Sequence, residues 1–169
     1  MRKARIRSFA PIADRRARVL ILGSMPGRAS LQAGRYYAHP QNVFWRIASD
    51  LLRFDPEAPY RTRVKALGTA RIALWDVLFS CVRDGSLDAR IERETANDFG
   101  AFFRDHRSIT HVYFNGAKAE ASFRRHVLGR IGVRNLSYIR LPSTSPANAS
   151  MTYEQKLNAW RAGMRGKAA

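Results

Sequence analysis

Several residue types are scarce in this chain, and each shortage excludes a class of protein. Cys81 is the only cysteine among 169 residues, which excludes an internal disulfide. One thiol and four histidines without HxxxH or HExxH spacing do not form a metal site, so we expect no metal and no cofactor. No apolar run approaches the ~20 residues of a bilayer span, and the basic N-terminus lacks the apolar core of a secretory signal. We therefore expect a cytoplasmic protein without a membrane partner.

Acidic residues are also scarce, with 13 Asp and Glu against 30 Lys and Arg, so the formal net charge is +17. Such an excess costs stability through self-repulsion, which indicates a polyanionic partner such as nucleic acid. Only five of the basic residues are lysine. Arginine suits phosphate and base recognition, but GC-rich genomes also favour it, so the net charge is the stronger indication.

What the chain does contain is a pattern of short apolar runs separated by helical periodicity. This alternation predicts an α/β fold, a three-layer sandwich around a four-stranded parallel sheet. The predicted strands are Val19–Ser24, Ile72–Leu78, His111–Asn115 and Leu136–Leu141. We expect a single domain over residues 19–169, preceded by a basic arm over residues 1–18. That arm has seven basic residues and one acidic residue, and is either partly disordered or laid on a phosphate backbone.

Helix signals and one connector complete the expected layout. Apolar residues at i, i+3, i+4 and i+7 from Phe44 predict a helix there, and Thr152-x-x-Gln155 is a capping box that opens a last helix. The polar segment Arg83–Glu94 is expected to be a surface loop.

Two loops of small residues, Gly23–Gly27 and Leu141–Asn148, each follow a predicted strand. Ligands bind at the carboxyl ends of strands in parallel sheets, so these loops could form two walls of one cleft. The first loop matches neither the Walker motif nor G-x-G-x-x-G, and alone it is typical of a tight turn. The second has hydroxyls suited to phosphates and a Pro146-Ala147 step suited to a wedge, although it also fits a plain proline-rich loop.

The residues between and beside these loops have two interpretations each. Tyr37 could stack on a base. Asn42 could contact a ligand or cap the helix at Phe44, and Asn115 could read a heterocycle or cap the helix at Ala117. His39, before Pro40, is typical of a structural or phosphate-facing histidine.

Taken together, these motifs resemble the uracil-DNA glycosylase superfamily, most of all its hypoxanthine/uracil branch and next its mismatch-specific branch. His39-Pro40-x-Asn42-x-Phe44-Trp45 and Leu141-Pro142-Ser143-Thr144-Ser145-Pro146-Ala147-Asn148 carry the resemblance, with support from Gly23–Gly27. It implies an enzyme that flips a deaminated base out of DNA and hydrolyses its glycosidic bond. The implied site residues are Asn42 and His39 for catalysis, Ser24, Met25, Tyr37 and Asn115 for the base, and Gly27, Arg28, Ser143, Thr144, Ser145, Pro146, Ala147 and Asn148 for DNA.

Two positions depart from the family pattern. Met25 and Leu141 stand where many members have a water-positioning Asp or Asn and a histidine. The hypoxanthine branch shares these absences and looks to rely on an asparagine that maps to Asn42. We expect a monomeric, monofunctional glycosylase that excises uracil first and hypoxanthine second and also binds the abasic product. The alternative is a non-catalytic binder of damaged or abasic DNA. A doubly wound nucleotide-binding enzyme is disfavoured because the phosphate fingerprint is absent.

Overall fold

A central sheet of four parallel strands organises the protein, whose computed structural model describes residues 4–132 and 134–165. The strands lie in the order β3-β2-β6-β7. Their register pairs Gly23 with Asp76 and Asn115 with Leu141, so all four carboxyl ends meet at one edge. The strands are β2 (Val19–Gly23), β3 (Ile72–Asp76), β6 (His111–Asn115) and β7 (Ser137–Leu141). The predicted three-layer α/β fold is confirmed.

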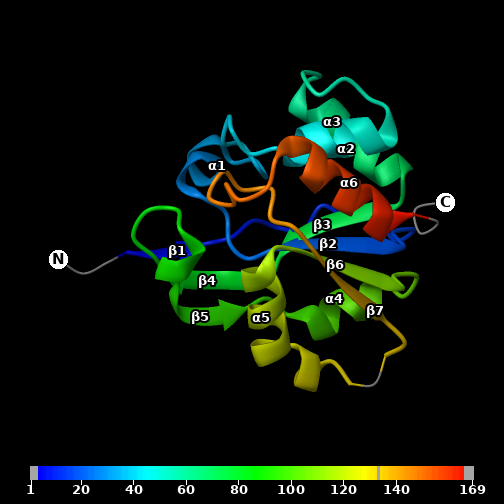
Figure 1. Ribbon diagram of the computed structural model, residues 1–169. Coiled ribbons are helices and arrows are strands. Elements are labelled where there is room, and N and C mark those ends of the chain that lie inside the picture. Colours follow the sequence, from blue (N-terminus) through cyan, green and yellow to red (C-terminus); the bar gives the residue numbers. More distant parts are fainter. Residues whose placement is uncertain (1–3, 133, 166–169) are drawn as a thin grey trace.

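Helices cover both faces of this sheet (Figure 1). One face carries α2 (Phe44–Leu52), α3 (Tyr60–Thr69) and α6 (Tyr153–Met164), and the other carries α4 (Phe99–Asp105) and α5 (Ala117–His126). Val19 and Ile21 pack against α2, α3 and α6 on the first face, whereas Leu20 and Leu22 pack against α4 and α5 on the second. Burial on both faces explains why these strands are continuously apolar rather than alternating.

The capping box predicted at the last helix is present. The N–H of Gln155 donates to Oγ1 of Thr152 at 3.2 Å, and the N–H of Thr152 donates to Oε1 of Gln155 at 2.9 Å. Trp160 donates from Nε1 to the carbonyl oxygen of Pro142, which ties α6 to the loop after β7. Among the helices of the described residues, none has the length and apolarity needed to cross a bilayer.

A second, antiparallel sheet was not predicted. It consists of β1 (Arg5–Arg7), β4 (Leu78–Val82) and β5 (Glu92–Ala96), in the order β1-β4-β5. The single strand predicted over Ile72–Leu78 is therefore wrong at its end. Strand β2 stops at Gly23, so the ladder stops at Asp76, and the chain passes through Val77 into the other sheet.

Two further segments differ from the expected layout. The segment Arg83–Glu94 contains a short 3₁₀ helix, Asp88–Arg90, and enters β5 at Glu92. The segment expected as a basic arm contributes β1, and Ile12 forms an isolated bridge with Leu74 of the central sheet. Its residues 1–3 lie outside the described residues. The chain also forms α1 (Arg28–Ala33) and a second 3₁₀ helix, Leu128–Arg130.

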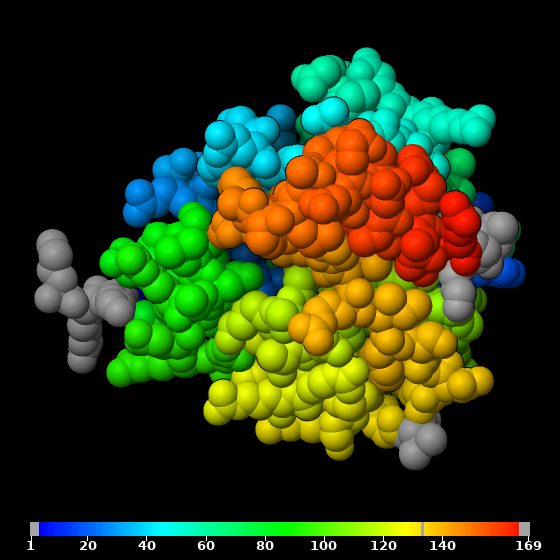
Figure 2. Space-filling model, in the orientation of Figure 1, coloured from blue at the N-terminus to red at the C-terminus, as the bar shows by residue number. Residues whose placement is uncertain are grey.

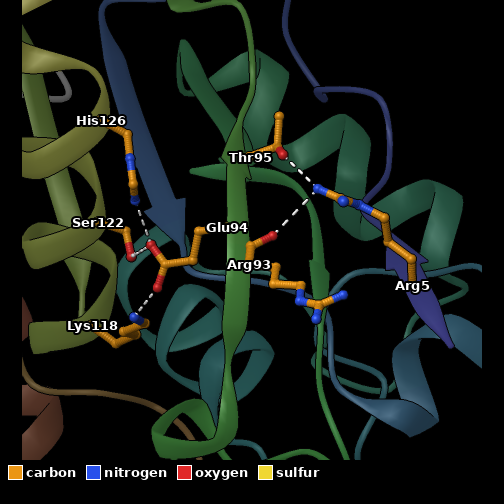
Figure 3. A network of polar contacts seen from close by, with 7 residues as sticks. All are labelled: Arg5, Arg93, Glu94, Thr95, Lys118, Ser122 and His126. Atoms are coloured by element: carbon orange, nitrogen blue, oxygen red, sulfur yellow. Dashed lines mark hydrogen bonds and ion pairs between the residues drawn. The ribbon is translucent and has the colours of Figure 1, made fainter. Parts of the chain in front are cut away.

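A polar network joins the second sheet to α5 (Figure 3). Glu94 of β5 accepts hydrogen bonds from Ser122 at 3.0 Å and from Lys118, and His126 Nε2 lies 2.7 Å from its Oε2. On the other side of β5, Arg5 donates to Oγ1 of Thr95 at 2.6 Å. These contacts attach β5 to α5 and, past the intervening β4, to the Arg5 side chain of β1.

Candidate active site

A cavity of about 540 Å³ opens at the carboxyl edge of the central sheet. Its floor includes Gly23, Asp76 and Asn115, the last residues of β2, β3 and β6. Figure 2 shows the segments around it on one side of the molecule: blue near residue 30, green near residue 85 and orange near residue 145. The cavity therefore lies where ligands bind in parallel sheets.

All the predicted site residues border this one cavity, although they lie up to 124 positions apart, from Ser24 to Asn148. The lining includes Ser24, Met25, Gly27, Arg28, Tyr37, His39, Asn42, Asn115, Ser143, Thr144, Ser145, Pro146, Ala147 and Asn148. The two small-residue loops do form two of its walls.

The first wall, formed by residues 23–27, is braced by residues 83–88. Ser24 donates from Oγ to Oδ1 of Asp88 at 2.7 Å, and the N–H of Arg28 donates to Oγ of Ser86 at 2.9 Å. The buried guanidinium of Arg83 also donates to the carbonyl oxygen of Pro26. The polar connector expected on the surface is thus part of the site.

Tyr37 lies at the floor with its ring stacked on Phe44, at 4.2 Å between centroids and 26° between planes. Its backbone adopts φ +53°, a left-handed conformation that is uncommon outside glycine. Burial, and next the nearby Asp76, raise the pKa of its hydroxyl above the ordinary range, so the hydroxyl stays protonated. The position suits an aromatic platform that is held rigidly by Phe44.

Glycine at position 23 allows the Asp76 carboxyl and the Tyr37 hydroxyl to lie close to the backbone at the floor of the cavity. A Cβ atom there would lie 2.5 Å from Oδ1 of Asp76 and 3.0 Å from the Tyr37 hydroxyl oxygen. Any larger residue would push the carboxyl and the tyrosine apart.

Asn42 acts at the start of α2. Its Oδ1 accepts the N–H of Phe44, the first residue of the helix, at 2.9 Å, but the N-cap is Val43, so Asn42 binds the helix start from the position before the cap. Its Nδ2 donates to no described residue, and Asn42 is one of the residues that line the cavity. His39 accepts the N–H of Gln41 at Nδ1 and is exposed at the rim.

Asn115 binds the second wall rather than capping α5. Its Nδ2 donates to Oγ1 of Thr144 at 3.0 Å, and its Oδ1 accepts the N–H of Thr144 at 2.9 Å. The N-cap of α5 is Gly116, which excludes the capping interpretation. Thr144 is fully buried, and its carbonyl oxygen accepts the N–H of Val43 at 3.1 Å. Thr144 therefore has no exposed surface for a phosphate. It instead connects the second wall to Asn115 at the end of β6 and to Val43 at the start of α2.

The exposed part of the second wall is stiffened by its own side chains. Oγ of Ser143 accepts the N–H of Ser145, and Oγ of Ser145 accepts the N–H of Ala147, each at 3.2 Å. Asn148 donates from Nδ2 to the carbonyl oxygen of Ser143 at 3.1 Å. These bonds present Pro146 and Ala147 to solvent on a rigid turn.

The lining residues that the sequence interpretation missed include Asp76, Ser86, Leu87 and Asp88. The only signal for Asp76 was an acidic residue within an apolar strand, and for Leu87 an apolar residue in a polar connector. Burial, and then the neighbouring Asp88, raise the pKa of the Asp76 carboxyl to about 7, against the opposing influence of Arg83. Within the described residues, no three His, Cys, Asp or Glu side chains are placed to hold a metal ion.

Comparison with known proteins gives consistent results. The family model described as "Uracil DNA glycosylase superfamily" matches residues 10–163. A protein named hypoxanthine DNA glycosylase from Methanosarcina barkeri is 37% identical over 112 residues, which cover 66% of this chain and 71% of the relative. Its namesake from Methanosarcina acetivorans is 35% identical over 114 residues, or 67% and 72% of the two chains. A solution NMR structure of a candidate uracil DNA glycosylase from M. acetivorans superimposes with a TM-score of 0.83 at 30% identity, covering 98% of this chain and 100% of that one.

Proposed function

We propose that this protein, a member of the uracil DNA glycosylase superfamily, excises uracil first and hypoxanthine second by base flipping. The proposal refines its general activity, that of a DNA glycosylase for deaminated bases. One observation carries this proposal. A single cavity at the sheet edge gathers the aromatic platform Tyr37 and both small-residue loops. Its volume lies within the range of small-molecule sites, so one flipped base fits whether it is a pyrimidine or a purine.

Cleavage of the glycosidic bond places positive charge on the sugar and negative charge on the departing base. Backbone N–H groups in residues 24–27 would stabilise the departing anion, because preorganised dipoles act strongly in a site that excludes water. Asn42, which lines the cavity at the start of α2, would position the attacking water through its amide. Neither small-residue loop contains a lysine, so hydrolysis without a Schiff base is expected.

Flipping a base leaves a gap in the stack, which apolar side chains can fill. Pro146 and Ala147 are exposed on one wall of the cavity. Leu87 lines the same cavity from the 83–88 segment and is 48% exposed, one of two large apolar side chains that are exposed among the described residues. We assign these residues to holding the duplex open. Mismatched bases would then be preferred because they cost least to extrude.

The test is a panel of oligonucleotides that each carry one uracil, hypoxanthine or xanthine, in single- and double-stranded form. Base release is measured under single-turnover conditions, together with binding to the same duplexes. We expect release of uracil and hypoxanthine. Binding without release of any base would contradict the enzyme and favour the non-catalytic binder.

A further inference from the structure

A buried carboxyl group at the floor of the cavity has no role in the mechanism above. Asp76 is only 3% exposed, yet it borders the cavity at the end of β3. Its Oδ2 is buried and accepts no hydrogen bond from any described residue. A buried carboxylate oxygen without a partner is costly in a folded protein, so such an atom in a cavity indicates a ligand contact.

The groups around Asp76 keep a substantial share of it neutral. Asp88 faces it from the 83–88 segment, and Tyr36 and Tyr37 flank the same floor. Arg83 is the cation that favours the ionised form of Asp76 and so lowers its pKa. Burial and Asp88 prevail and raise the pKa to about 7, so neutral and ionised forms are both populated near neutral pH.

We propose that Asp76 reads the Watson–Crick edge of the flipped base, and that it does so as the neutral carboxylic acid. This assignment rests on the proposed glycosylase function and deepens it. A neutral acid offers one O–H donor and one carbonyl acceptor side by side. The deaminated edge of uracil or hypoxanthine offers the complement, one ring N–H and one adjacent carbonyl. Acid and base therefore form a pair of hydrogen bonds.

Ionised Asp76 cannot make this pair. It has two acceptors and no donor, so one oxygen would face the carbonyl of the base. Its negative charge would also oppose the charge that develops on the departing base. The same neutral acid fits a pyrimidine and a purine, because both carry the same N–H and carbonyl arrangement. This gives a physical reason for one cavity to accept both bases.

Asn115 is a weaker candidate for this task. Both polar atoms of its amide already bind Thr144, which holds the second wall. Two buried oxygens at the floor have no partner among the described residues, Oδ2 of Asp76 and the Tyr37 hydroxyl, and of the two groups only the carboxyl offers a donor and an acceptor on adjacent atoms. Accordingly, we infer that Asn115 positions the wall while Asp76 contacts the base.

The experiment compares single-turnover excision of uracil and hypoxanthine by the wild type, Asp76→Asn and Asp76→Ala between pH 6 and pH 9. The neutral form is the active one, so the wild-type rate should fall as pH rises through 7. With a pKa of about 7, the neutral fraction drops from about half at pH 7 to about 1% at pH 9, so we expect a roughly 50-fold loss. Asp76→Asn carries a donor and an acceptor at every pH and should lack this decline.

Ionisation of the substrate base affects both proteins, so the ratio of their rates isolates Asp76. Asp76→Ala should lose at least about tenfold at pH 6, as expected for two lost hydrogen bonds. Binding to a duplex that carries an abasic analogue should stay within about twofold for both variants, because no base is present to be read. Asn115→Ala serves as the comparator, since a loosened wall should weaken that binding as well.

Identical pH profiles for the wild type and Asp76→Asn would overturn the assignment, as would full activity of Asp76→Ala. If Asp76→Asn does not fold, the wild-type profile decides alone, and the absence of a decline between pH 7 and pH 9 refutes the inference. Absence of excision by the wild type at every pH is a different result, because it contradicts the glycosylase function itself.

Discussion

Asn42 bears on both helix stability and the proposed chemistry. Its Oδ1 accepts the N–H of Phe44 at the start of α2, and the residue lines the cavity. Asn42→Ala removes this bond and the amide, and we expect excision to fall roughly 100-fold through misplaced water and stability to fall by about 1 kcal/mol through the lost hydrogen bond. Single-turnover kinetics and thermal unfolding measure the two effects separately.

Serine at this position distinguishes the two roles. Asn42→Ser retains a side-chain oxygen for the bond to Phe44 but has no amide. It should therefore recover the stability of the wild type and remain defective in excision. Full activity of the serine variant would show that Asn42 stabilises the start of α2 and has no catalytic role.

The sequence predicted that residues of the two loops, Tyr37, Asn42 and Asn115 lie around one cavity, because strand ends and loop chemistry place small and polar residues at one sheet edge. The partners of those residues could not. Nothing in the local sequence of Asn115 shows that its amide binds Thr144, 29 positions later. Asp76 was missed because its burial depends on Gly23 and Tyr37, which are remote in sequence.

Among the elements, the 83–90 segment carries a prediction about duplex opening. Leu87→Ala should lower excision from double-stranded DNA about tenfold, because roughly 1.4 kcal/mol of apolar burial between the bases is lost. Excision from single-stranded DNA should be unchanged, since no stack has to be opened. Rates on matched single- and double-stranded substrates measure the difference.

Phe79 provides the control for this prediction. It is the other large apolar side chain that is exposed among the described residues, at 41%, and it lies on β4 outside the cavity lining. Phe79→Ala should leave both rates unaltered. Equal losses on single and double strands for Leu87→Ala would argue against a wedge.

The attachment of β5 to α5 depends on Glu94. Burial opposes ionisation of this carboxyl, but hydrogen bonds from Lys118 and His126 outweigh it and hold its pKa below the ordinary value. A lowered pKa in the folded state contributes stability above the unfolded value, and this contribution is lost as pH falls. Glu94→Gln should therefore cost about 2 kcal/mol at pH 7 and less near pH 3.

Urea unfolding at the two pH values measures this cost. Glu57→Gln is the matched control, because Glu57 is exposed and forms no ion pair with the described residues. A cost for Glu94→Gln that does not shrink in acid would indicate that packing, rather than charge, joins β5 to α5.

The elements that the sequence failed to predict share a physical cause. The run through Val77 is apolar on both sides of a bend, so periodicity alone cannot separate β3 from β4. The parallel pairing of β3 with β2 ends at Gly23 and Asp76, so the boundary between β3 and β4 is defined by a neighbouring strand and not by the local sequence. Strand β1 has only three residues, Arg5–Arg7, and its pairing with β4 joins positions more than 70 residues apart.

For the molecule as a whole, the net charge of +17 predicts binding that weakens steeply with salt. Contact with three phosphates would lower affinity about 40-fold between 50 and 200 mM salt through counterion release. Affinity should depend little on flanking sequence, because phosphate contacts carry no sequence information. Fluorescence anisotropy across salt concentrations tests both statements, and a flat salt dependence would remove the electrostatic argument for DNA.

Two arginines map where this charge acts. Arg28 is exposed beside the cavity, whereas Arg130 is exposed beyond the far end of α5. Arg28→Gln should reduce the slope of log affinity against log salt by about one, and Arg130→Gln should not change it. Equal effects would indicate a diffuse attraction rather than a defined footprint.

The bond between Asn115 and Thr144 also bears on how the protein is made. A ribosome releases residues 23–27 more than 110 residues before residues 143–148, and chains begin to fold from the end that emerges first. Until Thr144 reaches Asn115, the cavity lacks one wall and the loop that presents Pro146 and Ala147 is unanchored. A partly synthesised copy without residues 143–148 therefore cannot hold a base, so excision of bases from DNA begins only after the second wall has been made.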